Sequence, residues 1–245
     1  MKTRFSQSRI ARKRRRLNPP AGLAASLIPP RPTLTRLASA AKSCRACPLW
    51  RRATQTVFGE GSPAAKVVFV GEQPGFEEDL AGKPFVGPAG KVLDKGLIAV
   101  GIERSEVYVT NAVKHFKWEP KGNQHMHKKP NASEVAACLP WLHAELKVLR
   151  PTVVVCLGAT AAQALLGKQF RVTKQRGQLM PSPLAPYVTA TVHPASILRA
   201  PDDVSRHQEM KRFIEDLQNI AKIIHSVPLG AIKGGTDLTG VINCR

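Results

Sequence analysis

The sequence is poor in acidic residues and in aromatic residues, and it has no long apolar run. Its 245 residues include 17 Asp or Glu against 37 Lys or Arg, which gives a formal net charge of +20. Such a surplus indicates an anionic partner, with nucleic acid as the first candidate and an acidic membrane surface as the second. No apolar run is long enough to cross a bilayer, and no signal-peptide core is present. We therefore expect a chain without a membrane segment, in the cytoplasm of a bacterium and close to its nucleoid.

Half of the charge surplus lies in the first 40 residues. They hold ten Lys or Arg and no acidic residue, and prolines such as Pro19 and Pro30 oppose regular structure. We predict a basic, disordered arm over residues 1–38 that binds polyanions without sequence preference. An Arg-rich, acid-free segment is also typical of an organelle transit peptide, although the prolines fit that alternative poorly. Residues 226–245 lack periodicity and are predicted to form a loose tail.

Between these ends, apolar β-branched runs alternate with helical patterns. The runs predicted to be strands are 66–72, 107–111, 152–158 and 187–194. The segments predicted to be helices are 89–100, 131–149, 159–167 and 202–224, and the second of them begins with a capping box of Asn131 and Glu134. Continuously apolar strands separated by helices indicate an α/β fold with a parallel sheet covered on both faces. We place this domain at residues 39–225.

Polar side chains stand where three of the predicted strands end. The first strand runs into Gly71, Glu72 and Gln73. The second ends at Asn111, and the fourth ends at His193. In open α/β sheets, ligands bind outside the carboxyl ends of the strands. We therefore expect Gln73, Asn111 and His193 to line one crevice, although each alone is also a common turn former.

The chain has five cysteines, an odd number that argues against a disulfide framework. Cys44 and Cys47 form a C-x2-C pair, and Cys138 lies on the predicted 131–149 helix. His115 can supply a fourth ligand, because imidazole replaces thiolate at some cluster irons. These donors suit either zinc or an iron–sulfur cluster, and free structural thiols remain the alternative.

Six longer motifs occur in order across residues 40–222. They are CRACPL, GEQPG with EDLAGKPFVGPAG, VYVTNAVKHFK, HKKPNASEVAACLPWL, VVVCLGATAAQALLG and TVHPASILRA. On these motifs the chain resembles the iron–sulfur uracil-DNA glycosylases of family 4, and within them the UdgX type. The resemblance implies a three-layer α/β/α sandwich with a central four-stranded parallel sheet, acting as a monomer on uracil-containing DNA and releasing free uracil.

The resemblance also implies a [4Fe-4S] cluster. Cys44, Cys47 and Cys138 stand where the family has cysteine ligands. Family 4 has a further cysteine after NVVK, whereas this chain reads NAVKH, as the UdgX type does, so His115 is expected to be the fourth ligand.

The expected roles of the crevice residues follow from the same resemblance. Phe85 stacks on the flipped base, Asn111 reads its pyrimidine edge, and His193 donates to the oxygen where negative charge develops. Glu72 and Gln73 belong to the catalytic loop, and Gly71 to the uracil-binding set. The residues expected to contact DNA are Arg199, Lys114, Lys128, Lys129 and His125.

The segment GNQHMHKKPN, residues 122–131, has the composition of a solvated basic loop. In the UdgX type, however, a histidine in an inserted loop bonds to the abasic sugar, and His127 stands at that position. A neutral imidazole is a competent nucleophile, and Glu72 is expected to orient it. Two departures from the type weaken the match, because His125 replaces an arginine and Phe76 replaces an acidic residue. Hydrolytic excision with turnover is the first alternative, and a non-catalytic iron–sulfur DNA-binding module is the second.

Overall fold

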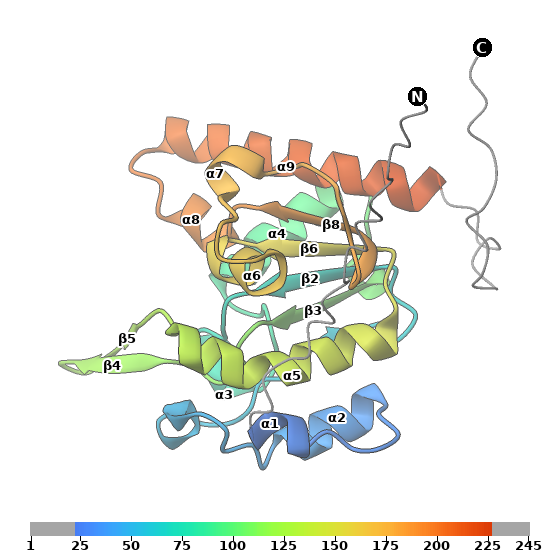
Figure 1. The fold of residues 1–245 in the computed structure, drawn as a ribbon. Coiled ribbons are helices and arrows are strands. Elements are labelled where there is room, and N and C mark those ends of the chain that lie inside the picture. The colour runs from blue at the N-terminus through green and yellow to red at the C-terminus, as the bar shows by residue number, and fades with distance from the viewer. Residues whose placement is uncertain (1–22, 227–245) are drawn as a thin grey trace, which may run out of the picture.

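A six-stranded sheet forms the centre of the protein in the computed structural model, which describes residues 23–226 (Figure 1). In spatial order its strands are β1 (Glu60–Gly61), β3 (Val107–Asn111), β2 (Val67–Gly71), β6 (Val153–Leu157), β8 (Ala185–Thr191) and β7 (Met180–Ser182). The four inner strands are parallel, which confirms the predicted four-stranded parallel sheet. The two outer strands are antiparallel additions, and both are too short to carry a sequence pattern.

Alternate residues of the parallel strands point to opposite faces of the sheet. Val68 and Val70 pack in a cluster with Leu142 of α5 (Ala132–Leu149), on the face also covered by α6 (Ala159–Leu166) and α7 (Val172–Gln175). Phe69 packs with Phe213 on the other face, which is covered by α4 (Pro88–Ala99) and α9 (Asp203–Ser226). Each such fully buried side chain contributes about 2 kcal/mol of transfer free energy. The predicted three-layer sandwich is therefore confirmed.

The predicted capping box at the start of α5 is confirmed. The backbone N–H of Glu134 donates to Asn131 Oδ1 at 2.9 Å, and the N–H of Asn131 donates to Glu134 Oε2 at 2.7 Å. These bonds satisfy two helix donors that would otherwise lack partners. Among the helices of residues 23–226, none is both long and apolar enough to span a membrane.

The prediction of a disordered arm over residues 1–38 is wrong for its second half. Helix α1 (Leu23–Ser26) and helix α2 (Leu34–Ala41) lie beyond α5, and Leu37 and Ala41 pack in one cluster with Trp141 (Figure 1). Helix α2 starts because Thr33 Oγ1 accepts the N–H of Arg36, and the prolines lie before it rather than inside it. Residues 1–22 of the predicted arm, and all but the first residue of the predicted tail, lie outside the described residues.

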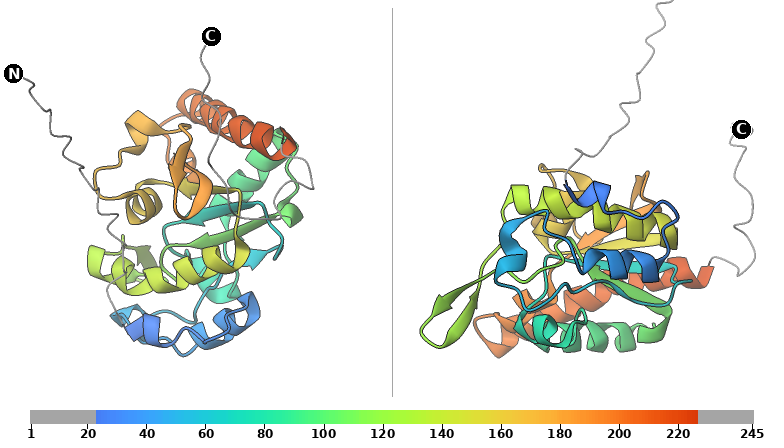
Figure 2. Two further views of the ribbon diagram at one scale, coloured as in Figure 1. Left: turned by 45° about the vertical axis from the view of Figure 1, so that its right-hand side comes forward. Right: turned by 90° about the horizontal axis from the view of Figure 1, so that it is seen from below.

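The segment interpreted by composition as a loop is a β-hairpin. Strands β4 (Trp118–Lys121) and β5 (Gln124–His127) pair antiparallel around Gly122 and Asn123, and the hairpin projects from the body of the molecule (Figure 2). Gly122 has a φ of 57°, as a tight two-residue turn requires. The Gly-Asn pair was the available signal. Exposed strands without apolar alternation, and Pro120 within one of them, concealed it.

Three short helical elements flank the parallel strands, two after strand ends and one before a strand. They are α3 (Phe76–Ala81) and α8 (Pro194–Leu198), which follow β2 and β8, and the 3-10 turn η2 (Arg104–Glu106), which precedes β3. A further 3-10 turn, η1 (Pro48–Arg51), follows the C-x2-C segment.

Candidate active site

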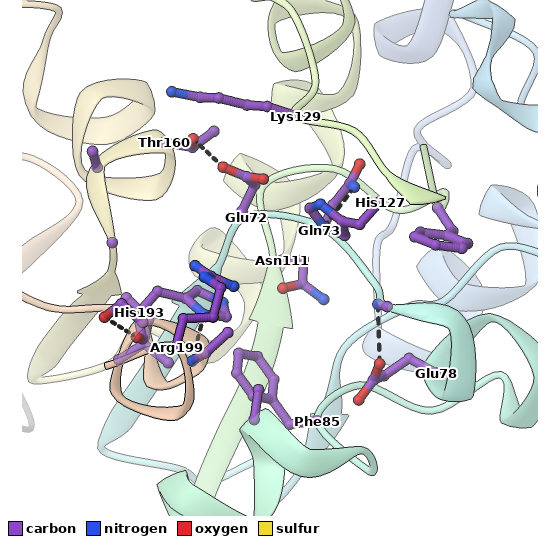
Figure 3. A pocket seen from close by; sticks show the side chains of 18 of the residues that line it. Glu72, Gln73, Glu78, Phe85, Asn111, His127, Lys129, Thr160, His193 and Arg199 are labelled. Carbon is purple, nitrogen blue, oxygen red and sulfur yellow. Dashed lines mark hydrogen bonds between the residues drawn. The ribbon is translucent and has the colours of Figure 1, made fainter. Parts of the chain in front are cut away.

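A pocket lies at the carboxyl ends of the four parallel strands. Because the strands run in the same direction, the residues that follow them meet at one edge of the sheet. Its lining includes Gln73 after β2, Asn111 at the end of β3, Gly158 after β6 and His193 after β8. The structure therefore confirms that the three polar residues at the predicted strand ends line one crevice. The hairpin adds His127 to the same pocket (Figure 3).

The floor of the pocket is built by Asn111 and Phe85, whose side chains lie against the backbone of Gly71. Asn111 is 3% exposed, and its Oδ1 has no hydrogen-bond partner within the described part of the chain. A Cβ added at Gly71 would lie 2.3 Å from Asn111 Oδ1 and 2.7 Å from Phe85 Cζ. Gly71 is thus required for the close approach of an amide and an aromatic ring. A buried amide oxygen without a partner, beside an aromatic face, suits a planar ligand with an N–H donor.

The loop that carries Phe85 has an unusual backbone. Phe85 has a φ of 58°, in the left-handed region that non-glycine residues seldom adopt. Glu78 fixes this loop, because its Oε1 accepts the N–H of Gly87 at 2.7 Å and its Oε2 accepts the N–H of Gly75 at 3.0 Å. One carboxylate therefore joins the loop after β2 to the loop that carries Phe85. Sequence reasoning missed Glu78, although an acidic residue in the first turn of a helix was a usable signal.

His193 is held as a neutral imidazole with a known tautomer. The N–H of Ala195 donates to its Nδ1 at 3.1 Å, so the ring proton lies on Nε2. Burial, with smaller contributions from Arg199 and His127, lowers the pKa of His193 to about 4. Its ring also stacks on Phe85, with centroids 6.1 Å apart. His193 can therefore present an N–H donor to a group bound against Phe85 throughout the neutral pH range.

His127 is held over the pocket by Gln73. The Gln73 amide nitrogen lies 2.9 Å from His127 Nε2, 3.0 Å from the carbonyl of Lys128 and 3.2 Å from the carbonyl of Lys117, so its two N–H donors are shared among three acceptors. Since the amide N–H donates, His127 Nε2 accepts and carries the lone pair. Burial lowers the pKa of His127, the carboxylate of Glu72 opposes this, and Arg199 adds to the lowering. The imidazole is therefore neutral at pH 7.

Glu72 does not make the expected hydrogen bond to His127. Its carboxylate accepts a hydrogen bond from Thr160 Oγ1, and it affects His127 through its charge alone (Figure 3). Gln73 makes the contact that we expected of Glu72, because the hairpin backbone places the imidazole against the amide. Sequence reasoning also missed Thr160, which stands two residues after Gly158 at the end of β6.

The basic residues expected at DNA fall into two groups. Arg199 and Lys129 line the pocket, and Lys128 lies on the hairpin side with an ion pair to Glu119 at 3.0 Å. His125 lies on β5 and also lines the pocket. Lys114 is different. It is 1% exposed, and its ammonium group pairs with the buried carboxylate of Glu145, so the expectation that it binds DNA phosphate is wrong.

Comparison with known proteins agrees with this geometry. The sequence profile of the uracil DNA glycosylase superfamily matches residues 58–218. The type-4 uracil-DNA glycosylase of Thermotoga maritima is 40% identical over 185 residues, which is 75% of this chain and 90% of that protein. The type-4 uracil-DNA glycosylase of Pyrobaculum aerophilum is 36% identical over 69% of this chain and 86% of its own length. The chain belongs to the uracil-DNA glycosylase superfamily.

In this member of the uracil-DNA glycosylase superfamily, a second set of predicted residues lines a smaller cavity between the C-x2-C segment and α5. Its walls include Cys44, Cys47, Cys138 and His115. The indole N–H of Trp141 donates to Cys44 Sγ at 3.3 Å, and the backbone N–H of Lys114 donates to Cys138 Sγ at 3.3 Å. Hydrogen bonds of this kind stabilise sulfur that carries negative charge.

The tautomer of His115 follows from its neighbour. The hydroxyl of Thr56 donates to the carbonyl of Ala41 at 3.1 Å, so toward His115 Nε2, at 3.0 Å, it accepts. Nε2 therefore carries the ring proton, and the lone pair lies on Nδ1. Metal-bound histidines commonly donate their second ring N–H in this way. Among residues 23–226, no three His, Cys, Asp or Glu side chains lie close enough to hold one metal ion. The four donors therefore share a cavity without converging on one point.

Proposed function

We propose that this protein excises uracil from DNA and that His127 then bonds to the abasic sugar. The observation that carries the proposal is the position of His127. It lies in the same pocket as Asn111, Phe85 and His193, on a hairpin that Gln73 ties to the loop after β2. A neutral histidine whose Nε2 lone pair is engaged by an amide N–H alone, placed beside a base-binding floor, is suited to attack the sugar once that N–H is displaced.

Uracil enters the pocket as an unpaired base, because a base inside a duplex is out of reach. Its ring stacks on Phe85, and its N3–H donates to Asn111 Oδ1, the buried oxygen that lacks a partner within residues 23–226. The Asn111 amide N–H then faces the uracil O4. Cytosine has an acceptor at N3 and a donor at C4, the reverse order, so the same amide orientation disfavours it.

Cleavage moves the electrons of the glycosidic bond onto the uracil ring. His193 stabilises the charge that develops on O2, since its Nε2–H is a preorganised donor beside Phe85. Removing such a donor commonly raises the activation free energy by about 3 kcal/mol. The sugar becomes an oxocarbenium-like cation, and the negative charge of Glu72 in the pocket stabilises it.

Capture forms a bond between His127 Nε2 and C1′ of the sugar. The Nε2 lone pair exchanges the Gln73 N–H for the carbon, while the Gln73 amide keeps its bonds to the carbonyls of Lys117 and Lys128. The product imidazolium is cationic, and its Nδ1 proton leaves to solvent or to the carboxylate of Glu72. The uracil anion takes a proton from solvent. Without His127, water takes the same position and the enzyme turns over.

The relatives named above are type-4 enzymes, so assignment of this chain to the UdgX subtype is a proposal and not a result of the comparisons. Two features support it. His115 stands in the position of a cysteine in family 4, and the hairpin places a histidine over the pocket. The competing proposal, hydrolytic excision, differs only in the nucleophile.

A denaturing gel of the protein incubated with end-labelled single-stranded uracil DNA tests the proposal. Capture predicts a protein–DNA band that survives denaturation and disappears in His127→Ala. The matched control is His207→Ala, which removes an exposed histidine on α9. Strand breaks after alkali without the shifted band would show hydrolytic turnover. Absence of both products would indicate a non-catalytic DNA-binding module.

We further propose that Cys44, Cys47, His115 and Cys138 hold a [4Fe-4S] cluster. Each ligand of such a cluster binds a different iron, so the ligands stand farther apart than those of a single zinc ion. Four donors that line one cavity, three of them cysteines, match the sulfur-rich ligand set of such a cluster. When bound, the cluster would cross-link the segment after α2 to α5 and to the chain beyond β3, as a structural element.

Iron and acid-labile sulfide analysis of the purified protein, together with its visible absorption, tests this assignment. His115→Cys, which supplies the thiolate found in family 4, should retain the cluster, whereas His115→Ala should lose iron. Stoichiometric zinc in place of iron would contradict the assignment.

A further inference from the structure

Phe76, His125 and Trp118 pack against one another at the rim of the pocket, and we call these three rings the rim stack. The mechanism proposed above does not use them. The ring of Phe76, the first residue of α3, stacks on His125 of β5 with centroids 5.0 Å apart and planes at 21°. The indole of Trp118 of β4 meets the same imidazole edge-on, with centroids 3.9 Å apart and planes at 70°. The indole N–H donates to the backbone carbonyl of Arg52 at 2.9 Å. The rim stack is therefore anchored at one end and open at the other.

The open end of the rim stack is apolar and exposed. Phe76 is 45% exposed although one face of its ring is covered by His125, and the neighbouring Met126 is 37% exposed. Both residues line the pocket that holds Asn111 and His127. A large aromatic ring exposed to water at the mouth of a binding pocket is suited to receive another flat apolar surface.

The charges around the rim stack identify the class of molecule that brings this surface. Lys129 and Arg199 line the same pocket, and within residues 23–226 neither side chain has a hydrogen bond or an ion pair. Unpaired cations beside an exposed aromatic ring form the combination that binds single-stranded nucleic acid, with phosphates on the cations and bases on the rings.

We propose that Phe76 is a stacking site for the unpaired nucleobase next to the uracil, so that the preferred substrate is single-stranded DNA. In a duplex, that neighbour stays paired to the opposite strand and stacked on its far side, so it is held in the helix and cannot turn onto Phe76. In a single strand, the base beside the flipped uracil has no pairing partner and is free to stack on Phe76. The inference rests on the proposed uracil-DNA glycosylase function, and it adds the substrate class.

A second reading of the rim stack makes a different prediction. Phe76 also joins α3 to the hairpin through His125, so it could serve only to hold His127 in place. In that case its loss would weaken every oligonucleotide by the same factor. Stacking on the neighbouring base predicts instead that the effect of Phe76 depends on whether that base is present.

The test measures the affinity of 2′-fluoro-uracil oligonucleotides by fluorescence anisotropy, because the fluorine suppresses bond cleavage and separates binding from chemistry. Three single strands are compared. One is complete, and the other two lack the base on the 5′ or the 3′ side of the uracil. The proteins are the wild type, Phe76→Ala, Phe76→Trp and the control Ile98→Ala, which removes a 77% exposed side chain at the far end of α4.

The wild type and Ile98→Ala should lose roughly tenfold in affinity when one of the two flanking bases is removed, as expected for one stacked base. Phe76→Ala should bind the complete strand about tenfold more weakly and be insensitive to that base, and Phe76→Trp should restore the sensitivity. Equal sensitivity in the wild type and Phe76→Ala would overturn the proposal, as would a wild type that ignores both flanking bases. Excision of ordinary uracil, measured separately, tests the proposed function independently of either result.

Discussion

Gly71 occupies the position where two side chains of the uracil pocket approach the backbone most closely. Replacing it with alanine places a Cβ 2.3 Å from Asn111 Oδ1 and 2.7 Å from Phe85 Cζ, so one of them must move. We expect Gly71→Ala to reduce single-turnover excision by roughly 100-fold, since small displacements of positioning groups have large effects on rate. Circular dichroism and the thermal midpoint control for folding. Wild-type activity in the folded variant would contradict the assignment of Asn111 and Phe85 as the base-binding floor.

The two histidines of the pocket predict that covalent capture and uracil excision are lost at different acidic pH values. In the proposed capture, His127 attacks as a neutral base, and its pKa is lowered from the ordinary value of about 6.5 by burial and by Arg199, against Glu72. Covalent capture should therefore be constant at neutral pH and fall only below about pH 6.5, as the lone pair is protonated. His193 keeps the arrangement that Ala195 imposes down to its pKa of about 4.

Excision should consequently persist to lower pH than capture. Single-turnover reactions across pH, scored both for total abasic sites and for crosslinked DNA, measure the two limbs. At pH values between these two limbs, the wild type should produce alkali-sensitive DNA without the covalent adduct. His127→Ala should do so at every pH at which it excises uracil. Coincident limbs for the two products would mean that one group controls both steps.

Elements with a strong apolar pattern could be predicted from the sequence, and elements held by particular contacts could not. The strand 107–111 was predicted with its exact bounds because five consecutive residues are buried on both faces. The hairpin was missed because all but one of its strand residues are exposed, and its position depends on Gln73 and on the rim stack. Helix α2 was missed because its apolar face is short, with only Leu37 and Ala41 buried in the cluster that it shares with α5.

Strand β3 and helix α5 are joined by a buried charge pair whose lysine was expected at DNA. Glu145 is fully buried and accepts hydrogen bonds from Lys114, Tyr108 and Thr110. Lys114 also donates to the carbonyl of Asn111 at 2.9 Å, which ties the pair to the end of the strand that forms the pocket floor. Nothing in a linear pattern separates this lysine from the exposed ones around it.

Removing one member of that pair should cost far more than removing both. Glu145→Ala leaves the Lys114 ammonium buried without its counter-charge, and we expect the free energy of unfolding to fall by about 4 kcal/mol. The double variant Lys114→Met with Glu145→Leu should recover most of that loss, because it removes both buried charges. Urea unfolding of the wild type, Glu145→Ala and the double variant measures this recovery. A double variant as unstable as Glu145→Ala would show that the unpaired lysine charge is not the cause of the loss.

The pocket is a property of the whole molecule, since its residues come from the carboxyl ends of the parallel strands, the segments that follow them, several helices and the hairpin. The sequence predicted the meeting of Gln73, Asn111 and His193, because parallel strands place their carboxyl ends together. It did not predict that Gln73 rather than Glu72 holds His127, or that Glu78 joins two loops. Both depend on distances of a few ångströms between segments far apart in the chain, which residue order does not encode directly.

The charge of the whole chain leads to the last prediction. Residues 1–22 carry eight Lys or Arg and no acidic residue, so deleting them lowers the formal charge from +20 to +12. Binding of such a segment to phosphates carries no sequence information, whereas recognition of uracil lies in the pocket. We expect the deletion to weaken binding of uracil-containing and thymine-containing strands by the same factor. The slope of log affinity against log salt should fall by about 0.7 for each phosphate that the shortened protein no longer neutralises.

A full-length variant with the eight basic residues replaced by Gln should behave like the deletion, because it keeps the length and removes the charge. A weakening confined to uracil-containing DNA would instead place this segment in the recognition of the base.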